Sequence, residues 1–389
     1  MGKVIPSSAP GPRFYRLRLQ RLMSDQPKTK MLQQIPDDHR LINLKVRDLT
    51  AHKRRLVEVR DSSTLSDTLN TMVANGVSAV PVVAPPGHWL GAGGSMIVES
   101  DKQTGSVRKH YIGMVTMLDV LAHIARAVSD NLDRKMAAHV SSIIGHCPEG
   151  LSLWSLNPNT RILDCMEMFS KGVHRALVPL ESSVKNISGV ELVESASAYT
   201  MLTQMDLMRF LQDKACELGD LVLSRPVSEL GALKDTVYAL TDQARVSDAI
   251  KCMSAEMLNA VPIVEASAGD QVDHKQLVNG KNRKVKGTFS ASDLKGCHLA
   301  TLQTWLPLMA VEFAEKIPMT PLFAGTRGAS PRELVTCQAT STLAQVIQKV
   351  TTKRVHRVWV VDEDGRLQGL VSLTDVIGAV RAALLSHSM

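Results

Sequence analysis

One pattern occurs four times along this chain of 389 residues, and a repeat of this kind constrains the architecture before any single element is considered. Each copy ends with an apolar stretch that runs into Ser or Thr, two further residues and Asp. The four aspartates lie 87, 87 and 82 residues apart and are Asp119, Asp206, Asp293 and Asp375. A valine-containing apolar run precedes each of them, at residues 77–83, 173–178, 258–264 and 355–361. We therefore expect four structural units of one kind.

Each copy has the residue pattern of alternating strands and helices. Leu65, Leu69 and Met72 fall at helical spacing before the first apolar run. Beyond its third residue each run is continuously apolar, which is typical of strands that are buried on both faces. Ser or Thr followed three residues later by Asp marks a helix N-terminus, because both side chains can bond to free backbone N–H groups there. The pattern predicts an α/β (α+β) fold built from four β-α-β-β-α units.

A single unit of this size cannot close a core well by itself, so each unit is expected to pair with the next along the chain. Two such pairs are expected to pack into a disc around a pseudo-two-fold axis. The predicted segments are a basic N-terminal tail and four repeats, at residues 1–40, 41–130, 139–215, 222–300 and 317–386.

The positive charge of the chain is concentrated in the tail. Residues 1–35 carry seven basic side chains and one acid, which accounts for +6 of the formal net charge of +7. A nucleic-acid surface needs its basic residues on a folded face, so we expect no nucleic-acid partner. The tail is predicted to be disordered and to serve as a targeting segment, an electrostatic contact or a solubilising extension. No apolar run approaches the roughly 18 residues that cross a bilayer, so an intracellular protein with no membrane partner is expected.

The motifs of common enzyme classes are absent from the sequence. There is no H-E-x-x-H, no G-x-S-x-G and no protein-kinase H-R-D sequence. The glycine-rich stretch 91–95 lacks the Gly-Lys-Ser/Thr of a P-loop, and it is interpreted as a flexible loop. The six cysteines include no C-x-x-C pair, so no metal site is predicted. We therefore expect a chain that is not an enzyme and has no cofactor.

The repeated pattern resembles the CBS domain. The segments that carry this resemblance are YIGMVTMLDVL, YTMLTQMDLM, VKGTFSASDL and LQGLVSLTDVI. Four such repeats in tandem resemble the gamma regulatory subunit of AMP-activated protein kinase and its sucrose-non-fermenting relatives. Stretches such as APPGHWLGAGGSMIVESDKQTG and TTKRVHRVWVVDEDG are similar to the plant gamma-like subunits of the PV42 type in particular. The resemblance covers about residues 41–386.

The resemblance implies two paired (Bateman) modules that bind AMP, ADP or ATP between paired repeats. In that family the motif aspartate bonds the ribose hydroxyls, and basic residues on the preceding strand reach the phosphates. Carried over by position, the nucleotide-binding residues would be Thr116, Asp119, His174, Arg175, Thr203, Asp206, Ser290, Asp293, His356, Arg357, Ser372 and Asp375. The resemblance also implies kinase catalytic and scaffold subunits as partners, and a cytoplasmic or nuclear location.

Two features of the sequence leave the number of sites open. The first and third repeats have Ser78-Ala79 and Asn259-Ala260 where the second and fourth have His-Arg. An Asp placed three residues after Ser or Thr also caps a helix without any ligand, which stabilises it by about 1 kcal/mol. The sequence is therefore consistent with two functions. One is a nucleotide-sensing regulatory subunit of a protein kinase, and the other is an interaction scaffold whose clefts are vestigial.

Overall fold

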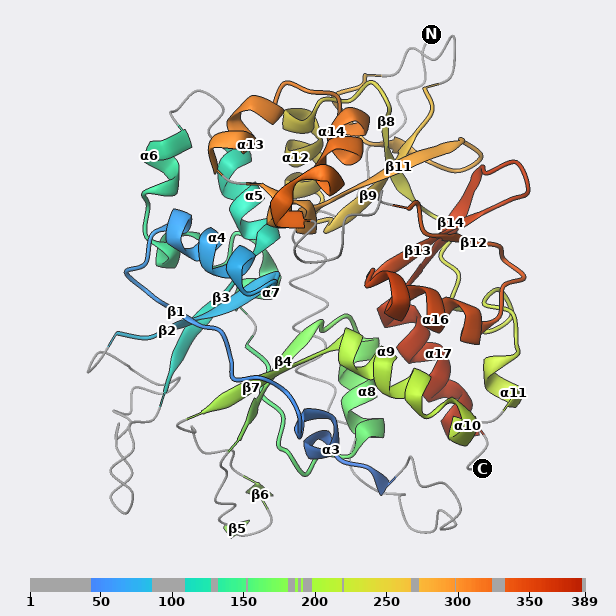
Figure 1. Cartoon of the computed structure of the whole chain (residues 1–389). Helices are drawn as coiled ribbons and strands as arrows, with labels where there is room; N and C mark the ends of the chain where they lie inside the picture. Colours follow the sequence, from blue (N-terminus) through green and yellow to red (C-terminus); the bar gives the residue numbers. More distant parts are fainter. Residues whose placement is uncertain are drawn as a thin grey trace, which may run out of the picture. The chain divides into compact units, whose positions relative to one another are not determined.

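The structure is a computed structural model in which the repeated unit can be followed four times (Figure 1). It describes residues 43–85, 109–126, 132–151, 153–180, 186–187, 190–191, 198–218, 220–266, 273–297, 299–323 and 333–386. All of the described elements belong to one structural unit, residues 38–389. The basic tail and the glycine-rich stretch 91–95 lie outside the described residues.

The first two repeats have the predicted order of elements. Repeat 1 consists of β1 (Val59–Arg60), α4 (Leu65–Ala74), β2 (Ala79–Val83), β3 (Tyr111–Thr116) and α5 (Met117–Arg126). Repeat 2 consists of α8 (Ile162–Ser170), β4 (Arg175–Pro179), β7 (Tyr199–Thr203) and α9 (Gln204–Asp213), with the short hairpin β5 (Asn186–Ile187) and β6 (Val190–Glu191) between its strands.

The last two repeats follow the same order. Repeat 3 consists of β8 (Tyr238–Thr241), α12 (Val246–Ala255), β9 (Ala260–Val264), β10 (Val278–Asn279), β11 (Val285–Ser290) and the 3₁₀ helix η2 (Ala291–Gly296). Repeat 4 consists of β12 (Thr336–Cys337), α16 (Leu343–Lys353), β13 (Arg357–Val361), β14 (Leu367–Ser372) and α17 (Leu373–Ser386). The second helix of repeat 3 is shorter than its counterparts, and it ends at Gly296, which packs so closely on Ile317 that a Cβ there would lie 2.8 Å from that side chain.

Each repeat is built on one small mixed sheet. In repeats 1, 3 and 4 the first strand runs parallel to the second, and the last strand runs antiparallel to it. Repeat 2 has the antiparallel pair β4–β7, and Ser155 adds a single parallel bridge to Leu177. The antiparallel pair is the feature that positions the candidate site, because its last strand delivers the chain to the start of the second helix.

A segment that precedes each repeat packs on the neighbouring repeat; we call these four stretches the leading segments. Their helices are α3 (Val46–Thr50), α6 (Leu132–Met136), η1 (Val140–Ile143), α7 (Pro148–Leu151), α10 (Ala215–Leu218), α11 (Asp220–Leu223), α13 (Leu299–Trp305), α14 (Ala310–Lys316) and η3 (Ile317–Met319). In each case a single bridge ties the leading segment to the residue before a helix of the neighbouring repeat, and the bridges are Lys45–Arg161, His139–Thr64, Pro226–Thr342 and Met309–Arg245.

These bridges show that repeat 1 exchanges leading segments with repeat 2, and repeat 3 with repeat 4. The sheets of the same pairs also meet. Tyr111 and Tyr199 pack edge to face with ring centroids 5.7 Å apart, and Trp359 donates from Nε1 to Thr288 Oγ1 at 2.7 Å. The prediction of two sequential pairs is therefore confirmed.

The helices carry the contacts between the two pairs. One apolar core joins repeats 1 and 3, where α5 packs on α12 (Figure 1). A second core joins repeats 2 and 4, where α8 packs on α17 and α9 on α16. Apolar burial is the main stabilising term in such cores, and here it is shared by repeats that are far apart in sequence.

Candidate functional site

In repeats 2 and 4 an arginine lies directly opposite a helix cap across the antiparallel strand pair. Arg175 at the start of β4 pairs with Thr203 at the end of β7, and Arg357 of β13 pairs with Ser372 of β14. Residues in this relation have Cβ atoms about 4.5–5.5 Å apart, so each arginine is anchored beside the start of the following helix. The same register position in repeats 1 and 3 is taken by Ala79 and Ala260.

All four motif aspartates accept hydrogen bonds at the start of their own helix. The backbone N–H of the Ser or Thr three positions earlier donates to each carboxylate, at 2.8 Å in repeats 1 to 3 and at 3.0 Å in repeat 4. The hydroxyl of that residue also donates in repeats 1, 2 and 4, at 2.6, 2.7 and 2.5 Å. These bonds use one oxygen, Oδ2, so the surroundings of Oδ1 decide whether a carboxylate can serve a ligand.

The aspartates of repeats 1 and 3 are buried. Asp119 is 0% exposed and Asp293 is 1% exposed. Asp119 Oδ1 accepts a hydrogen bond from the backbone N–H of Cys147 at 2.7 Å, so both of its oxygens are bonded within the protein. Burial raises the pKa of the Asp119 carboxyl, whereas the hydrogen bonds from Thr116 and Cys147 act in the opposite direction. As folded here, Asp119 offers no accessible oxygen to a ribose.

The aspartates of repeats 2 and 4 each face a lysine from a leading segment. Lys53 Nζ lies 2.5 Å from Asp206 Oδ2, and Lys234 Nζ lies 3.8 Å from Asp375 Oδ1. The two aspartate side chains keep 13% and 12% of their surface exposed. These carboxylates are therefore partly accessible. Each has a lysine beside it, and Asp206 Oδ1 also lies 3.6 Å from NH1 of Arg209 in the same repeat.

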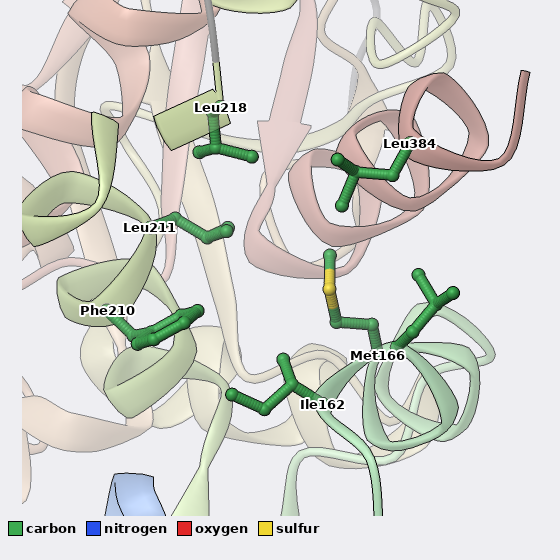
Figure 2. Close-up of a pocket in the computed structure, with 7 residues that line it drawn as sticks. Ile162, Met166, Phe210, Leu211, Leu218 and Leu384 are labelled. Atoms are coloured by element: carbon green, nitrogen blue, oxygen red, sulfur yellow. The ribbon is translucent and has the colours of Figure 1, made fainter. Parts of the chain in front are cut away.

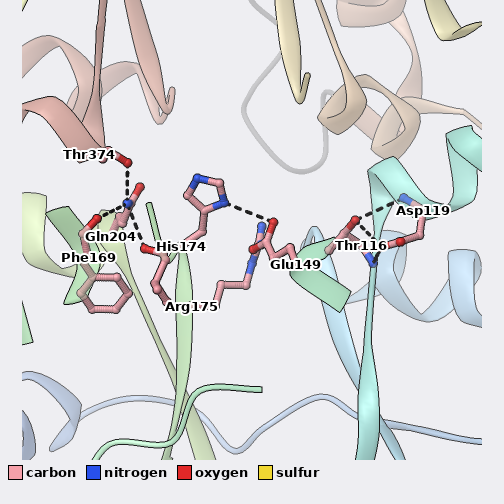
Figure 3. A network of polar contacts seen from close by, with 9 residues as sticks. Thr116, Asp119, Glu149, Phe169, His174, Arg175, Gln204 and Thr374 are labelled. Carbon is pink, nitrogen blue, oxygen red and sulfur yellow. Dashed lines mark hydrogen bonds and ion pairs between the residues drawn. The ribbon is translucent and has the colours of Figure 1, made fainter. Parts of the chain in front are cut away.

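The predicted His174-Arg175 pair is bonded to an acid that we had not predicted. Glu149 of α7 contacts Arg175 NH1 through Oε1 and lies 3.2 Å from His174 Nδ1 through Oε2 (Figure 3). Burial by itself would raise the pKa of the Glu149 carboxyl, but the charge of Arg175 and the bonds to both partners lower it to about 2. The pair is thus neutralised from within the chain.

The His356-Arg357 pair of the fourth repeat interacts with the same region. The His356 side chain is exposed, yet the protein around its ring and the neighbouring positive charges lower its pKa to about 3. The groups that act on it in this way are Arg175, Arg357, Lys295 and His174. Arg357 NH1 donates to the carbonyl oxygen of Ala260 at 2.9 Å. The structure therefore brings the two predicted His-Arg pairs close enough to influence each other.

Glu149, Lys53, Lys234 and Lys295 are site residues that sequence reasoning missed. The first three lie in leading segments, outside the repeated pattern, and no motif marks them. The equivalence of Lys53 and Lys234, each ahead of the first strand of an odd repeat, is a signal that could have been found by aligning the two halves of the chain.

A separate apolar pocket lies between helices of repeats 2 and 4. Side chains from α8, α9, α10 and α17 line it, and none of the twelve predicted site residues does (Figure 2). The residues are Ile162, Leu163, Met166, Phe210, Leu211, Leu218 and Leu384. The pocket has no charged side chain that could hold a phosphate.

The described residues contain neither a cluster of metal ligands nor a membrane-spanning helix. Within them, no group of three or more His, Cys, Asp or Glu side chains could hold a metal ion. No helix in that part of the chain is long and apolar enough to cross a membrane.

The repeated unit, with a capped helix beside the start of its second strand, defines a CBS-domain protein, and the CBS domain family matches residues 330–382. The fold agrees with the crystal structure of protein MJ1225 from Methanocaldococcus jannaschii, a candidate archaeal homologue of gamma-AMPK. That match has a TM-score of 0.56 and 17% identity, and it covers 86% of this chain and 99% of the other.

Sequence comparison is more specific. The chain is 70% identical over 348 residues to the SNF1-related protein kinase regulatory subunit gamma-like PV42b of Arabidopsis thaliana. This alignment covers 89% of this chain and 97% of the relative. It is 62% identical to PV42a of the same plant, over 90% of this chain and 98% of the relative. The chain belongs to the PV42-type gamma-like regulatory subunits of SNF1-related protein kinase, a non-catalytic family. The resemblance seen in the sequence and the expectation that the chain is not an enzyme are confirmed.

Proposed function

We propose that the chain regulates a SNF1-related protein kinase by binding adenine nucleotides at repeats 2 and 4. A nucleotide that binds one conformation of the kinase complex better than another shifts the population toward that conformation. This proposal adds a ligand and two sites to the family assignment.

The observation that carries the proposal is the register of Arg175 opposite Thr203 and of Arg357 opposite Ser372. It places a guanidinium beside a helix start that holds a partly accessible aspartate. A nucleotide needs such a combination, because arginine binds phosphate with a fixed fork and a carboxylate accepts hydrogen bonds from ribose hydroxyls. The free N–H groups and the dipole of the helix start favour negative charge nearby.

Each repeat takes a different role in this proposal. Asp206 and Asp375 bind ribose, and the His-Arg pairs of the same repeats bind phosphate. Asp119 and Asp293 keep their bonds within the protein, since they are buried and the strand opposite them carries alanine.

Isothermal titration calorimetry of the full chain with AMP, ADP and ATP tests the proposal. Arg175→Ala and Arg357→Ala should each weaken binding at one site, whereas adenosine, which has no phosphate, should respond little to either change. Arg161→Ala is the matched control, because Arg161 pairs at the surface with Asp164. If no nucleotide bound to the parent protein, the proposal would be wrong.

A scaffold with vestigial clefts remains the second candidate function. The ion pairs Glu149–Arg175 and Lys53–Asp206 favour it, because they satisfy the site charges without any ligand. Kinase association that is unaffected by AMP, ADP or ATP, together with no calorimetric signal, would support this candidate.

The partners in our proposal are the catalytic and scaffold subunits of the kinase, and the location is the cytoplasm, the nucleus or both. The names of the two Arabidopsis relatives support the kinase association. Co-purification with tagged kinase subunits tests the partners, and imaging of a fluorescent fusion tests the location.

A further inference from the structure

The acid that neutralises the His174-Arg175 pair is held in place by the aspartate of repeat 1. Cys147, whose N–H donates to Asp119 at 2.7 Å, lies two residues before Glu149. On the other side of Glu149, Gly150 packs against β3. A Cβ added to Gly150 would lie only 2.6 Å from the carbonyl oxygen of Met114. The helical turn α7 is therefore fixed against repeat 1 on both sides of the glutamate.

From this fixed position Glu149 reaches across to repeat 2. Both of its carboxylate oxygens are used, one on Arg175 and the other on His174, and its side chain is 23% exposed (Figure 3). A carboxylate that engages a guanidinium and an imidazole together presents the same chemistry as an oxygen pair of a phosphate group. Its low pKa agrees with a carboxylate that is ionised over the physiological range.

We infer that Glu149 is an internal anion in the phosphate position of repeat 2, which a nucleotide phosphate must displace. This inference rests on the proposed function and specifies how that site selects its ligands. The displacement lowers the affinity of every phosphorylated ligand by a common factor, whereas adenosine does not have to displace the carboxylate. Asp119 is the positioning residue, because it anchors the turn that carries the glutamate.

Repeat 4 provides a contrast within the same chain. The last of the helical elements named above that lead into repeat 4 is η3, which consists of Ile317, Pro318 and Met319 and carries no carboxylate. Arg357 there donates to the neutral carbonyl oxygen of Ala260. Among these contacts of the described residues, Arg175 thus meets a carboxylate of a leading segment, and Arg357 meets a backbone carbonyl.

The variant Glu149→Gln tests the inference, because the amide keeps the shape and loses the charge. The titrations use the full chain with the change Arg357→Ala, so that the measured binding comes from the site of repeat 2. Affinity for AMP should rise roughly ten-fold, the factor expected when a competing charged hydrogen bond is lost. Affinity for ADP and ATP should rise by a similar factor, because each must displace the same carboxylate. Binding of adenosine should not change.

Two controls separate the inference from the proposed function. Glu167→Gln removes an acid that is also ion-paired, with Arg381 and Lys171 on another helix face, and should leave all affinities unchanged. In a protein that also carries Arg175→Ala, the change Glu149→Gln should bring no gain. If AMP binds the parent and Arg175→Ala weakens it, but Glu149→Gln leaves it unchanged, the inference is overturned and the proposed function stands. If no variant binds any nucleotide, both are overturned.

Discussion

The ammonium nitrogen of Lys53 lies 2.5 Å from a carboxylate oxygen of Asp206, although the two residues are 153 positions apart. The contact joins the leading segment of repeat 1 to the helix start of repeat 2. Lys234 and Asp375 repeat the arrangement at 3.8 Å in the second half of the chain. Asp206 and Asp375 thus each receive a counter-charge from the leading segment of the odd repeat before them, and Asp206 has a second one from Arg209 of its own repeat. Each proposed site therefore depends on a pair of repeats.

The ion pair between Lys53 and Asp206 should contribute modestly to stability. Because both side chains keep some contact with solvent, 23% and 13% exposed, we expect Lys53→Met to lower the free energy of unfolding by about 1 kcal/mol. A double-mutant cycle with Asp206→Asn, measured by urea denaturation, should give a coupling energy of similar size. Strictly additive effects of the two changes would contradict a direct interaction.

The arginine of repeat 4 should matter more for ligand binding than for folding. We expect Arg357→Ala to weaken AMP binding by about 1.5–3 kcal/mol, the range for hydrogen bonds to a charged group. Loss of the bond from Arg357 to the Ala260 carbonyl should also lower the free energy of unfolding, by about 1 kcal/mol. Calorimetry and urea denaturation of the same samples measure the two effects. Equal AMP affinity in variant and parent would remove repeat 4 from the proposal.

Stability should depend on pH through His356. Its pKa is about 3 in the folded chain against an ordinary value of 6.5, so between these values the unfolded chain binds a proton that the folded chain does not. Stability should therefore fall as the pH drops below 6.5. The protein packed around the ring acts in this direction, and so do the interactions with Arg175, Arg357, Lys295 and His174.

The variant His356→Asn should reduce the loss of stability between pH 7.5 and pH 5, measured by urea denaturation. This range avoids the window between about 4.5 and 2 in which the Glu149 carboxyl titrates. His52→Asn changes an exposed histidine and serves as the control. An identical pH dependence in the parent and in His356→Asn would show that the ring is protonated as readily in the folded chain as in the unfolded one.

Glycines at one position of the repeat should differ in their tolerance of a side chain. A Cβ on Gly369 would lie 2.3 Å from the backbone oxygen of Lys234, whereas on the corresponding Gly287 the nearest atom would be 3.6 Å away. We expect Gly369→Ala to lower the free energy of unfolding by about 1–3 kcal/mol, because backbone must move to admit the methyl group. Gly287→Ala is the matched control and should change it by less than about 1 kcal/mol. A similar loss in both would mean that the close approach at Gly369 is not the cause.

The sequence predicted the repeated unit well, because its signals are local. Helical spacing at Leu65, Leu69 and Met72, the apolar strands and the capping residues all act within one copy of the pattern. The pairing of consecutive repeats followed from the need of each unit for a partner surface.

The candidate site was harder to predict, since its members come from several parts of the chain. The same Ser/Thr-x-x-Asp pattern precedes a buried Asp119 and a partly accessible Asp206, and only packing separates them. Glu149 lies 25 positions before His174 in a leading segment, where no periodicity or motif marks it. The alanines that stand in place of arginine in repeats 1 and 3 were visible in the sequence. The strand register shows that they lie opposite the capping residues Thr116 and Ser290.

The exchange of leading segments has a consequence for how this chain can be divided. Each leading segment is continuous in sequence with one repeat and bonds to the other. For example, the carbonyl oxygen of Leu44, which precedes repeat 1, accepts a hydrogen bond at 2.9 Å from the N–H of Ile162 in repeat 2. A fragment that started at Val59 would therefore expose apolar surface on the second repeat while leaving the first nearly intact. A fragment that keeps two consecutive repeats must therefore also keep both of their leading segments, because each segment bonds to the repeat that it does not adjoin.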